Sequence, residues 1–166
     1  MKQPTLINTE LIAAVRERFQ LDWNGVHGAP HWARVRVNGL MLAPLTNTRT
    51  DVIELFAFFH DSCRENDYED PDHGLRAAEF AASMRNRIFY IDDAGFKLLR
   101  KACETHSNGQ LQADPTVQTC WDADRLDLWR VQITPDPKRL ATTAARSSQL
   151  YNLAKQRSRH WLLNAR

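Results

Sequence analysis

The sequence predicts an all-α fold, a single compact bundle of about seven helices spanning residues 1–166. Apolar residues recur at intervals of three and four along nearly the whole chain, as one buried face of a helix requires. Several of these segments begin with a capping residue, often followed by Pro, which suits the first turn of a helix. No internal repeat or convincing pair of strands is visible, although residues 87–91 would also fit a short extended run.

The first three helices are defined by their caps and by their apolar stripes. Leu11, Val15 and Phe19 share one face of the first helix, and the second begins at a Pro suited to the first helical position. These helices are expected to run from a cap at Asn8 or Thr9 to before Gly25, from Pro30 to about Pro44, and from a cap at Thr48 or Thr50 to His60 and Asp61.

The remaining four helices follow a polar loop over residues 64–70. Three of them are introduced by an Asp cap, and a Pro-rich break at residues 134–138 precedes the last. They are expected to run from Asp70 and Pro71 through Phe80, from Asp92 to His106 with Gly109 as the stop, from Asp114 and Pro115 through Asp122 to Trp129, and from about Ala144 to Leu163.

Composition places the chain among ordinary globular domains, with 43% hydrophobic and 25% charged residues. Its net charge of +2 is uneven, because residues 136–166 carry seven Lys or Arg against one Asp. We interpret this basic C-terminal helix as a solvated face, without a strong signal for nucleic acid. The three cysteines, Cys63, Cys103 and Cys120, form no C-x-x-C pair, and Cys103 and Cys120 are expected in the core. No signal peptide or membrane-spanning run is visible, so a cytoplasmic location and no membrane partner are expected.

The most informative segment is the helix that ends in His60 and Asp61. Residues 52–59 before this doublet are apolar on almost every side, as in a helix buried in the middle of a protein. A carboxylate in such a place is costly unless it is paired or binds a metal. The doublet therefore indicates a buried metal ion or a tight hydrogen-bond network.

His31 and Asp122 are expected to join this doublet. His31 lies one residue inside its helix with the apolar Val35 one turn later, and Asp122 shares a stripe with Leu126 and Trp129. Either residue alone would be read as a satisfied core histidine or a buried salt bridge. Together with the doublet, they place two histidines and two acids on inward faces of three helices, a mixed nitrogen and oxygen donor set for a divalent transition metal.

These residues resemble the HD superfamily, an all-helical fold named for its His-Asp doublet. The resemblance rests on His31 in "H-x-x-R-V", the "HD" at 60–61 and "DADRLD" at 122–127, and covers about residues 25–130. It also extends to small bacterial proteins that read "FHDS-x-R-E-N-D" followed by "DP-x-H-G-x-R-A-A". Most characterised members are metal-dependent phosphohydrolases, and the resemblance implies that His31, His60, Asp61 and Asp122 are the metal ligands.

Polar residues after the doublet are candidates for the remaining chemistry. Glu65 and Asp67 are close enough in sequence to act as general acid or base, or are simply solvated loop carboxylates. Arg64 and Arg76 could bind an anionic substrate, Arg64 in bidentate fashion. His73, near a helix N-terminus, is a further substrate-binding candidate.

The number of metal ions is left open between one and two. His73 and His106 lie where HD proteins with two metals recruit extra histidines, and His27 precedes His31 by four residues. These three are expected either to bind a second ion or to contact substrate. We favour one ion, because His106 shares an apolar stripe with Leu99 and Cys103. The donor types do not distinguish Mn, Fe, Co, Ni, Zn and Mg.

The sequence thus predicts a metal-dependent phosphohydrolase that uses metal-activated water on a small phosphorylated metabolite, with a nucleotide as the favoured substrate. Two alternatives remain. One is a di-iron oxygenase of the HD type, in which His73 and His106 help to bind two irons. The other is a non-catalytic HD module that binds a nucleotide or a protein partner.

Overall fold

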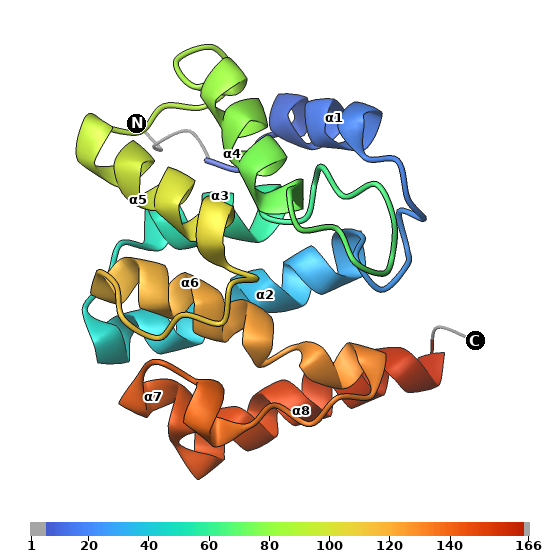
Figure 1. The fold of residues 1–166 in the computed structure, drawn as a ribbon, viewed down its shortest axis with the longest axis vertical. Coiled ribbons are helices and arrows are strands. Elements are labelled where there is room, and N and C mark those ends of the chain that lie inside the picture. The colour runs from blue at the N-terminus through green and yellow to red at the C-terminus, as the bar shows by residue number, and fades with distance from the viewer. Residues whose placement is uncertain (1–5, 165–166) are drawn as a thin grey trace.

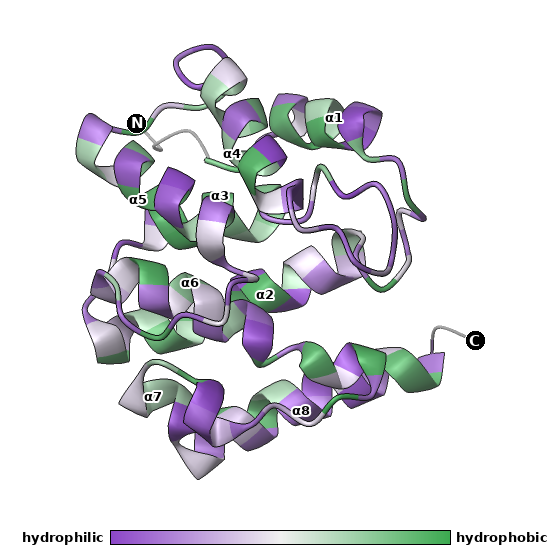
Figure 2. Cartoon of the chain, in the orientation of Figure 1, coloured by the Kyte–Doolittle hydropathy of each residue, from purple (hydrophilic) through white to green (hydrophobic). Residues whose placement is uncertain are grey.

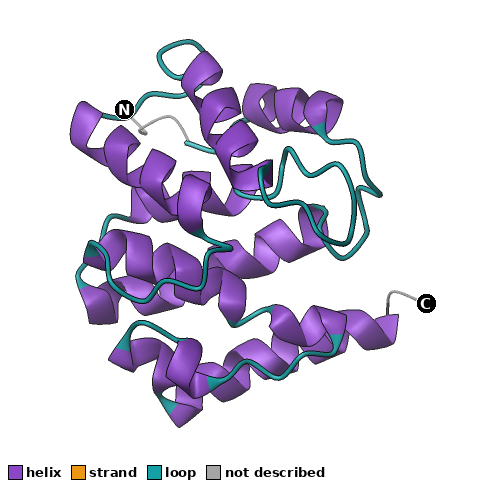
Figure 3. Cartoon of the chain, viewed as in Figure 1, coloured by secondary structure: helices purple, strands orange, loops and turns teal. Residues whose placement is uncertain are grey.

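The computed structural model describes residues 6–164, and all of the regular structure in that range is helical (Figures 1 and 3). In chain order the α-helices are α1 (Thr9–Arg18), α2 (Ala29–Thr46), α3 (Thr50–Phe59), α4 (His73–Met84), α5 (Asp93–Thr105), α6 (Pro115–Arg125), α7 (Thr143–Arg146) and α8 (Ser148–Asn164). Two 3₁₀ turns, η1 (Leu128–Val131) and η2 (Pro137–Arg139), lie between α6 and α7. The prediction of an all-α bundle of about seven helices is confirmed.

Three of the predicted helix starts are confirmed by cap geometry. Asn8, Asp92 and Asp114 each lie at an N-cap, and their side chains accept from the backbone N–H of Leu11, Gly95 and Thr116 respectively. Each bond satisfies one of the amide donors that a helix leaves free in its first turn.

Two elements differ from the prediction because of local competition for hydrogen bonds. Asp70 does not cap α4. Its carboxylate accepts instead from Arg76 and from the backbone N–H of Glu65, and the helix begins three residues later. The expected last helix is split at Ser147, which has an extended backbone, and a side-chain cap from Thr142 starts the short α7. Residues 87–91 form no strand, only one isolated bridge between Arg85 and Phe89.

The long α2 lies at the centre of the bundle and packs against α3 and α6 on one side and α7 and α8 on the other (Figure 1). Gly39 in α2 makes this packing close, since a Cβ there would lie 2.3 Å from Ile53 Cγ2 of α3. Along the helices, Figure 2 shows green, apolar residues alternating with purple, hydrophilic ones, as helices with one buried face require. One apolar cluster contains residues from each of the helices α1 to α6. A smaller cluster, which includes Leu42, Leu126 and Leu140, packs against residues of α7 and α8. No helix in residues 6–164 is both long and apolar enough to cross a membrane.

Candidate metal centre

Two groups of His and Asp side chains lie next to each other between α2, α3, α4, α5 and α6. The first His/Asp group consists of His31, His60 and Asp124, and the second of Asp61, His73 and His106. In each group one ligand atom per residue lies within 4.8 Å of the others, which is close enough to share a metal ion. Five of the six residues are buried, and the side chain of Asp124 is 16% exposed.

Asp61 lies between the two groups and presents one carboxylate oxygen to each. Its Oδ2 is 3.6 Å from His31 Nε2 and 3.7 Å from His60 Nε2. Its Oδ1 is 3.3 Å from His73 Nε2 and 3.6 Å from His106 Nε2. The carboxylate of the doublet therefore has the orientation of a ligand that bridges two ions.

Hydrogen bonds at Nδ1 fix the tautomers of all four histidines. His60 Nδ1 lies 3.1 Å from the carbonyl oxygens of Phe56 and Ala57, His106 Nδ1 lies 2.8 Å from that of Cys103, and His73 Nδ1 contacts that of Asp70. A carbonyl oxygen only accepts, so each of these Nδ1 atoms carries the proton and donates. His31 Nδ1 donates in the same way to Asp127 Oδ2 at 2.7 Å. The four Nε2 atoms are thus left with their lone pairs.

These lone pairs face one another in two close pairs. His31 Nε2 lies 3.1 Å from His60 Nε2, and His73 Nε2 lies 2.8 Å from His106 Nε2. Two acceptor atoms at these distances repel each other unless a proton or a cation lies between them. Imidazole Nε2 with its Nδ1–H held by an oxygen is also how proteins orient histidine as a metal ligand.

The charge states suit a divalent cation. Burial lowers the pKa of His60 to about 3, so this imidazole is neutral at physiological pH. Burial alone would raise the pKa of Asp61, but the imidazoles around it, first His60 and then His106, His27 and His73, hold it well below its ordinary value. The pKa of Asp124 is lowered against the effect of burial by His31 and His60. Metal ligands must be deprotonated, and the shifts of His60, Asp61 and Asp124 all favour the deprotonated form.

Asp127 orients the first His/Asp group without being part of it. Its carboxylate is fully buried and accepts from His31 Nδ1, from Arg34 Nε at 2.8 Å, and from Ser158 Oγ of α8. Burial raises the pKa of Asp127, but the hydrogen bond and charge of His31 outweigh it and bring it to about 2. The basic C-terminal helix therefore contacts the site through one side chain.

A pocket of about 500 Å³ opens over both groups. Its lining includes Asp61, His73, His106 and Asp124 from the centre, and four cations: Arg64, Arg125, Arg130 and Arg139. Arg64 is buried and held by the carbonyl oxygens of Asn66 and Tyr68, with its Nη1 3.4 Å from His73 Nε2. The pocket thus has positive charge next to the carboxylate and imidazole ligands.

The structure brings together His31, His60, Asp61, His73 and His106 but not Asp122. Both carboxylate oxygens of Asp122 accept from the 141–142 segment, at 2.7 Å from the backbone N–H of Ala141 and of Thr142. Asp122 therefore holds the segment before α7, and its prediction as a metal ligand is wrong. Asp124, two residues further on α6, lies beside the histidines instead.

Two other residues are placed away from the pocket. The guanidinium of Arg76 donates to both oxygens of Asp70 and to the carbonyl of Cys63, and it does not line the pocket, which argues against its prediction as a substrate ligand. Glu65 is exposed, lies 3.6 Å from Arg76 and also does not line the pocket, against its prediction as general acid or base. Asp67 does line it, as does His27, whose Nδ1 lies 2.9 Å from Asp61 Oδ2.

Sequence reasoning missed Asp124, Asp127, Ser158 and Arg130. Arg130 donates from Nε to the Val26 carbonyl and has Nη1 4.0 Å from Asp124 Oδ1. Asp124 and Asp127 were visible in "DADRLD", three residues apart on what would be one helical face, but no apolar stripe singled them out. Ser158 carries no sequence signal.

No protein-family model, curated protein or solved structure matches this chain. The resemblance to the HD superfamily consequently stays a prediction made from its motif. The site is described by its own geometry, which is that of buried His/Asp groups that could hold a metal ion.

Proposed function

We propose that this chain is a metal-dependent phosphohydrolase of the HD type, acting on a phosphate ester or anhydride of a small metabolite such as a nucleotide. The proposal includes two divalent ions, one in each His/Asp group. The sequence alone favoured one ion, and the division of the six donors into two groups around Asp61 is what favours two.

The observation that carries the proposal is the pairing of unprotonated Nε2 atoms. A structural histidine pair in a core would place a donor opposite an acceptor. Here all four Nδ1 protons are already bound to oxygens outside the pairs, and four lone pairs converge on Asp61. Such an arrangement is costly without cations, and it is what a preformed metal site requires.

The rest of the pocket supports a phosphorylated substrate. When bound, divalent ions lower the pKa of coordinated water towards about 7 and polarise a phosphoryl oxygen. Arg64 and Arg130 lie beside the two groups and would bind the anionic oxygens of the substrate. Asp67, at the wall of the pocket, is the remaining candidate for a proton-transfer group near the leaving oxygen.

The test combines metal analysis with a matched pair of variants on α6. The purified protein should contain two divalent ions per chain and release phosphate from members of a nucleotide panel assayed with Mn²⁺, Mg²⁺, Co²⁺ and Fe²⁺. Asp124→Asn should lose one ion and the activity. Asp122→Asn, two residues away, should keep both ions and activity and lose only stability. Equal metal loss in both variants, or metal-loaded protein without turnover, would count against the proposal.

An oxygenase is the second candidate, because His73 and His106 do complete a second group as a di-iron centre would need. Oxygen dependence separates the two. A phosphohydrolase keeps its rate under anaerobic conditions, whereas an oxygenase consumes O₂ only with iron bound and stops when O₂ is removed.

A further inference from the structure

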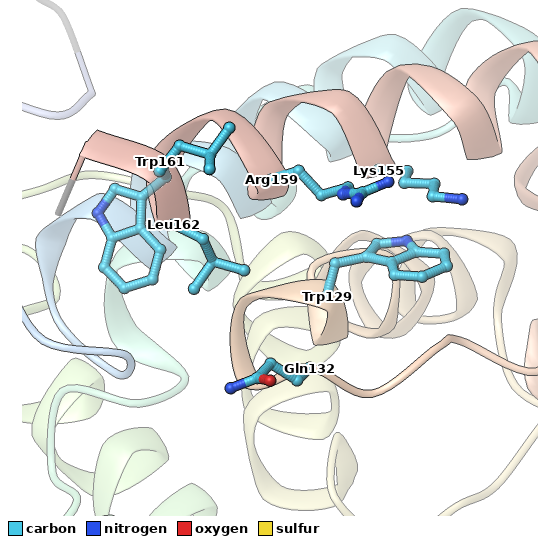
Figure 4. A pocket seen from close by; sticks show the side chains of 7 residues that line it. Trp129, Gln132, Lys155, Arg159, Trp161 and Leu162 are labelled. Carbon is cyan, nitrogen blue, oxygen red and sulfur yellow. The ribbon is translucent and has the colours of Figure 1, made fainter. Parts of the chain in front are cut away.

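A second pocket lies on the other face of η1, away from the metal centre. It has a volume of about 930 Å³ and is lined by Trp129, Gln132, Lys155, Arg159, Trp161, Leu162 and Leu163 (Figure 4). None of these residues lines the metal pocket, although Leu128, Arg130 and Val131 of the same 3₁₀ turn do. The two pockets are therefore separate, with η1 as the wall between them.

The lining of this second pocket combines flat aromatic rings with positive charge. Figure 4 shows the indoles of Trp129 and Trp161 at its two ends, with Arg159 of α8 between them and the Gln132 amide on the η1 side. Lys155 and Arg159 form no ion pair or hydrogen bond with any residue in 6–164, and no acidic side chain of that range lines the pocket. Both cations are thus available to an anion.

Both indoles are held in place by neighbouring side chains. The guanidinium of Arg34 lies 4.5 Å from the Trp161 ring centroid, and Lys155 Nζ lies 4.7 Å from that of Trp129. Tyr151 packs edge-on against Trp129 at 5.8 Å. Rings already held in place lose little conformational entropy when a ligand binds.

We propose that this pocket is a binding site for a nucleoside monophosphate, separate from the metal centre. The base would lie against Trp129 or Trp161, since stacking on an aromatic side chain is sequence-tolerant and favourable. The phosphate would be bound by Arg159 and Lys155, whose charges it complements. Gln132 offers both a donor and an acceptor to the polar edge of the base. The proposal does not depend on the proposed phosphohydrolase activity.

Three related probes test whether the ring and the phosphate are both needed. Isothermal titration of the full chain with AMP should show binding, while adenosine, which lacks the phosphate, and ribose 5-phosphate, which lacks the ring, should each bind at least about tenfold more weakly. Absence of AMP binding at millimolar concentration overturns the proposal. So does equal affinity for all three probes.

Variants then locate the site. Trp161→Leu and Arg159→Met should each weaken AMP binding by about tenfold or more, with the fold checked by circular dichroism. Lys138→Met removes a charge from the same basic segment outside the pocket and should change the affinity less than twofold. AMP affinity should be unchanged in Asp61→Ala, which alters only the metal pocket. Loss of binding in Asp61→Ala, or its retention in Trp161→Leu and Arg159→Met, assigns AMP to the metal pocket and overturns the proposal.

A membrane surface is the competing ligand for this face of α8, because Leu163 is exposed and the helix carries several basic residues. Sedimentation with phosphatidylglycerol vesicles tests it directly. Binding to these vesicles that is lost in Trp161→Leu, without any AMP binding, would assign this face to lipid and overturn the proposal.

Discussion

The two His/Asp groups hold their histidines in different ways. In the second group, His73 and His106 donate to backbone carbonyls of Asp70 and Cys103, which no substitution removes. In the first, His31 donates to the side chain of Asp127, which is held in turn by Ser158 of α8. His60 of the first group is also held by backbone carbonyls, so the first group depends on packing of the C-terminal helix through His31 alone, while the second depends on the backbone of the bundle around it.

Close approach of two helices explains how the second group forms. Gly74 follows His73 at the start of α4, and a Cβ there would lie 2.2 Å from the carbonyl oxygen of Cys103 and 3.3 Å from His106 Cε1. A side chain at this position would separate α4 from the end of α5. The glycine thus allows His73 and His106 to meet, whereas His31 of the first group is oriented by a chain of side-chain hydrogen bonds through Asp127 and Ser158.

The largest expected effect removes what the two groups share. Asp61→Ala should abolish binding of both proposed ions and reduce the proposed phosphohydrolase activity to background, because it removes the one carboxylate within residues 6–164 that faces both groups. Metal content of the purified variant and phosphate release measure this. Arg64→Ala is the control. It should keep both ions and raise KM about tenfold, because Arg has no lone pair for a metal. Metal loss in Arg64→Ala would contradict the separation of ligands from substrate contacts.

Asp127→Asn should act on the first group alone. A weakened partner for His31 Nδ1 should lower the metal affinity of that group by about 10–100-fold, measured by competition with a chelator, and leave the second group loaded. The reciprocal variant, His73→Ala with His106→Ala, should remove the second ion and keep the first. If either change emptied both groups equally, the two would be one cooperative site.

The groups should also respond oppositely to pH in metal-free protein. Burial holds the pKa of His60 at about 3, so between pH 6.5 and about 3 the unfolded chain binds a proton at this residue and the folded chain does not. The free energy of unfolding therefore decreases as the pH is lowered through this range. Burial also opposes charge on His106, but the neighbouring carboxylate of Asp61 favours the protonated imidazole more strongly and raises the pKa. His106 therefore stabilises the fold below pH 6.5 and loses this contribution as pH rises through its folded pKa. Ring resonances of the two histidines in an NMR titration check both directions, and a His60 signal that titrates near 6.5 would contradict this.

The smallest effect is expected for Ser158→Ala. It removes one of three donors to a buried carboxylate, which should cost about 1.5 kcal/mol in the free energy of unfolding and weaken the first group a few-fold. Chemical denaturation and chelator competition measure the two quantities. Gln156→Ala, exposed on the same helix, should change neither. No loss of stability in Ser158→Ala would show that α8 does not support the site.

Local signals in the sequence were enough to predict the helical architecture and most residues of the candidate site. The caps at Asn8, Asp92 and Asp114 and the buried run before His60 and Asp61 are local signals, and local physics decides them. His31 also follows from a buried position next to an apolar neighbour one turn later. His73 and His106 were expected to be ligands or contacts, and their place in the chain was the only guide to this.

The choice between Asp122 and Asp124 depends on long-range packing. The two lie about 200° apart around α6, because an α-helix turns about 100° per residue. If one face of α6 were exposed at this point, helical periodicity would exclude one of the two from the interior. Both faces are covered instead, because Asp122 is buried against the segment before α7 and Asp124 is mostly buried beside the histidines. The sequence placed an acid in the interior. Which acid faces the metal centre depends on where α7 returns to pack, and that long-range contact, like the one from Ser158, leaves no local pattern.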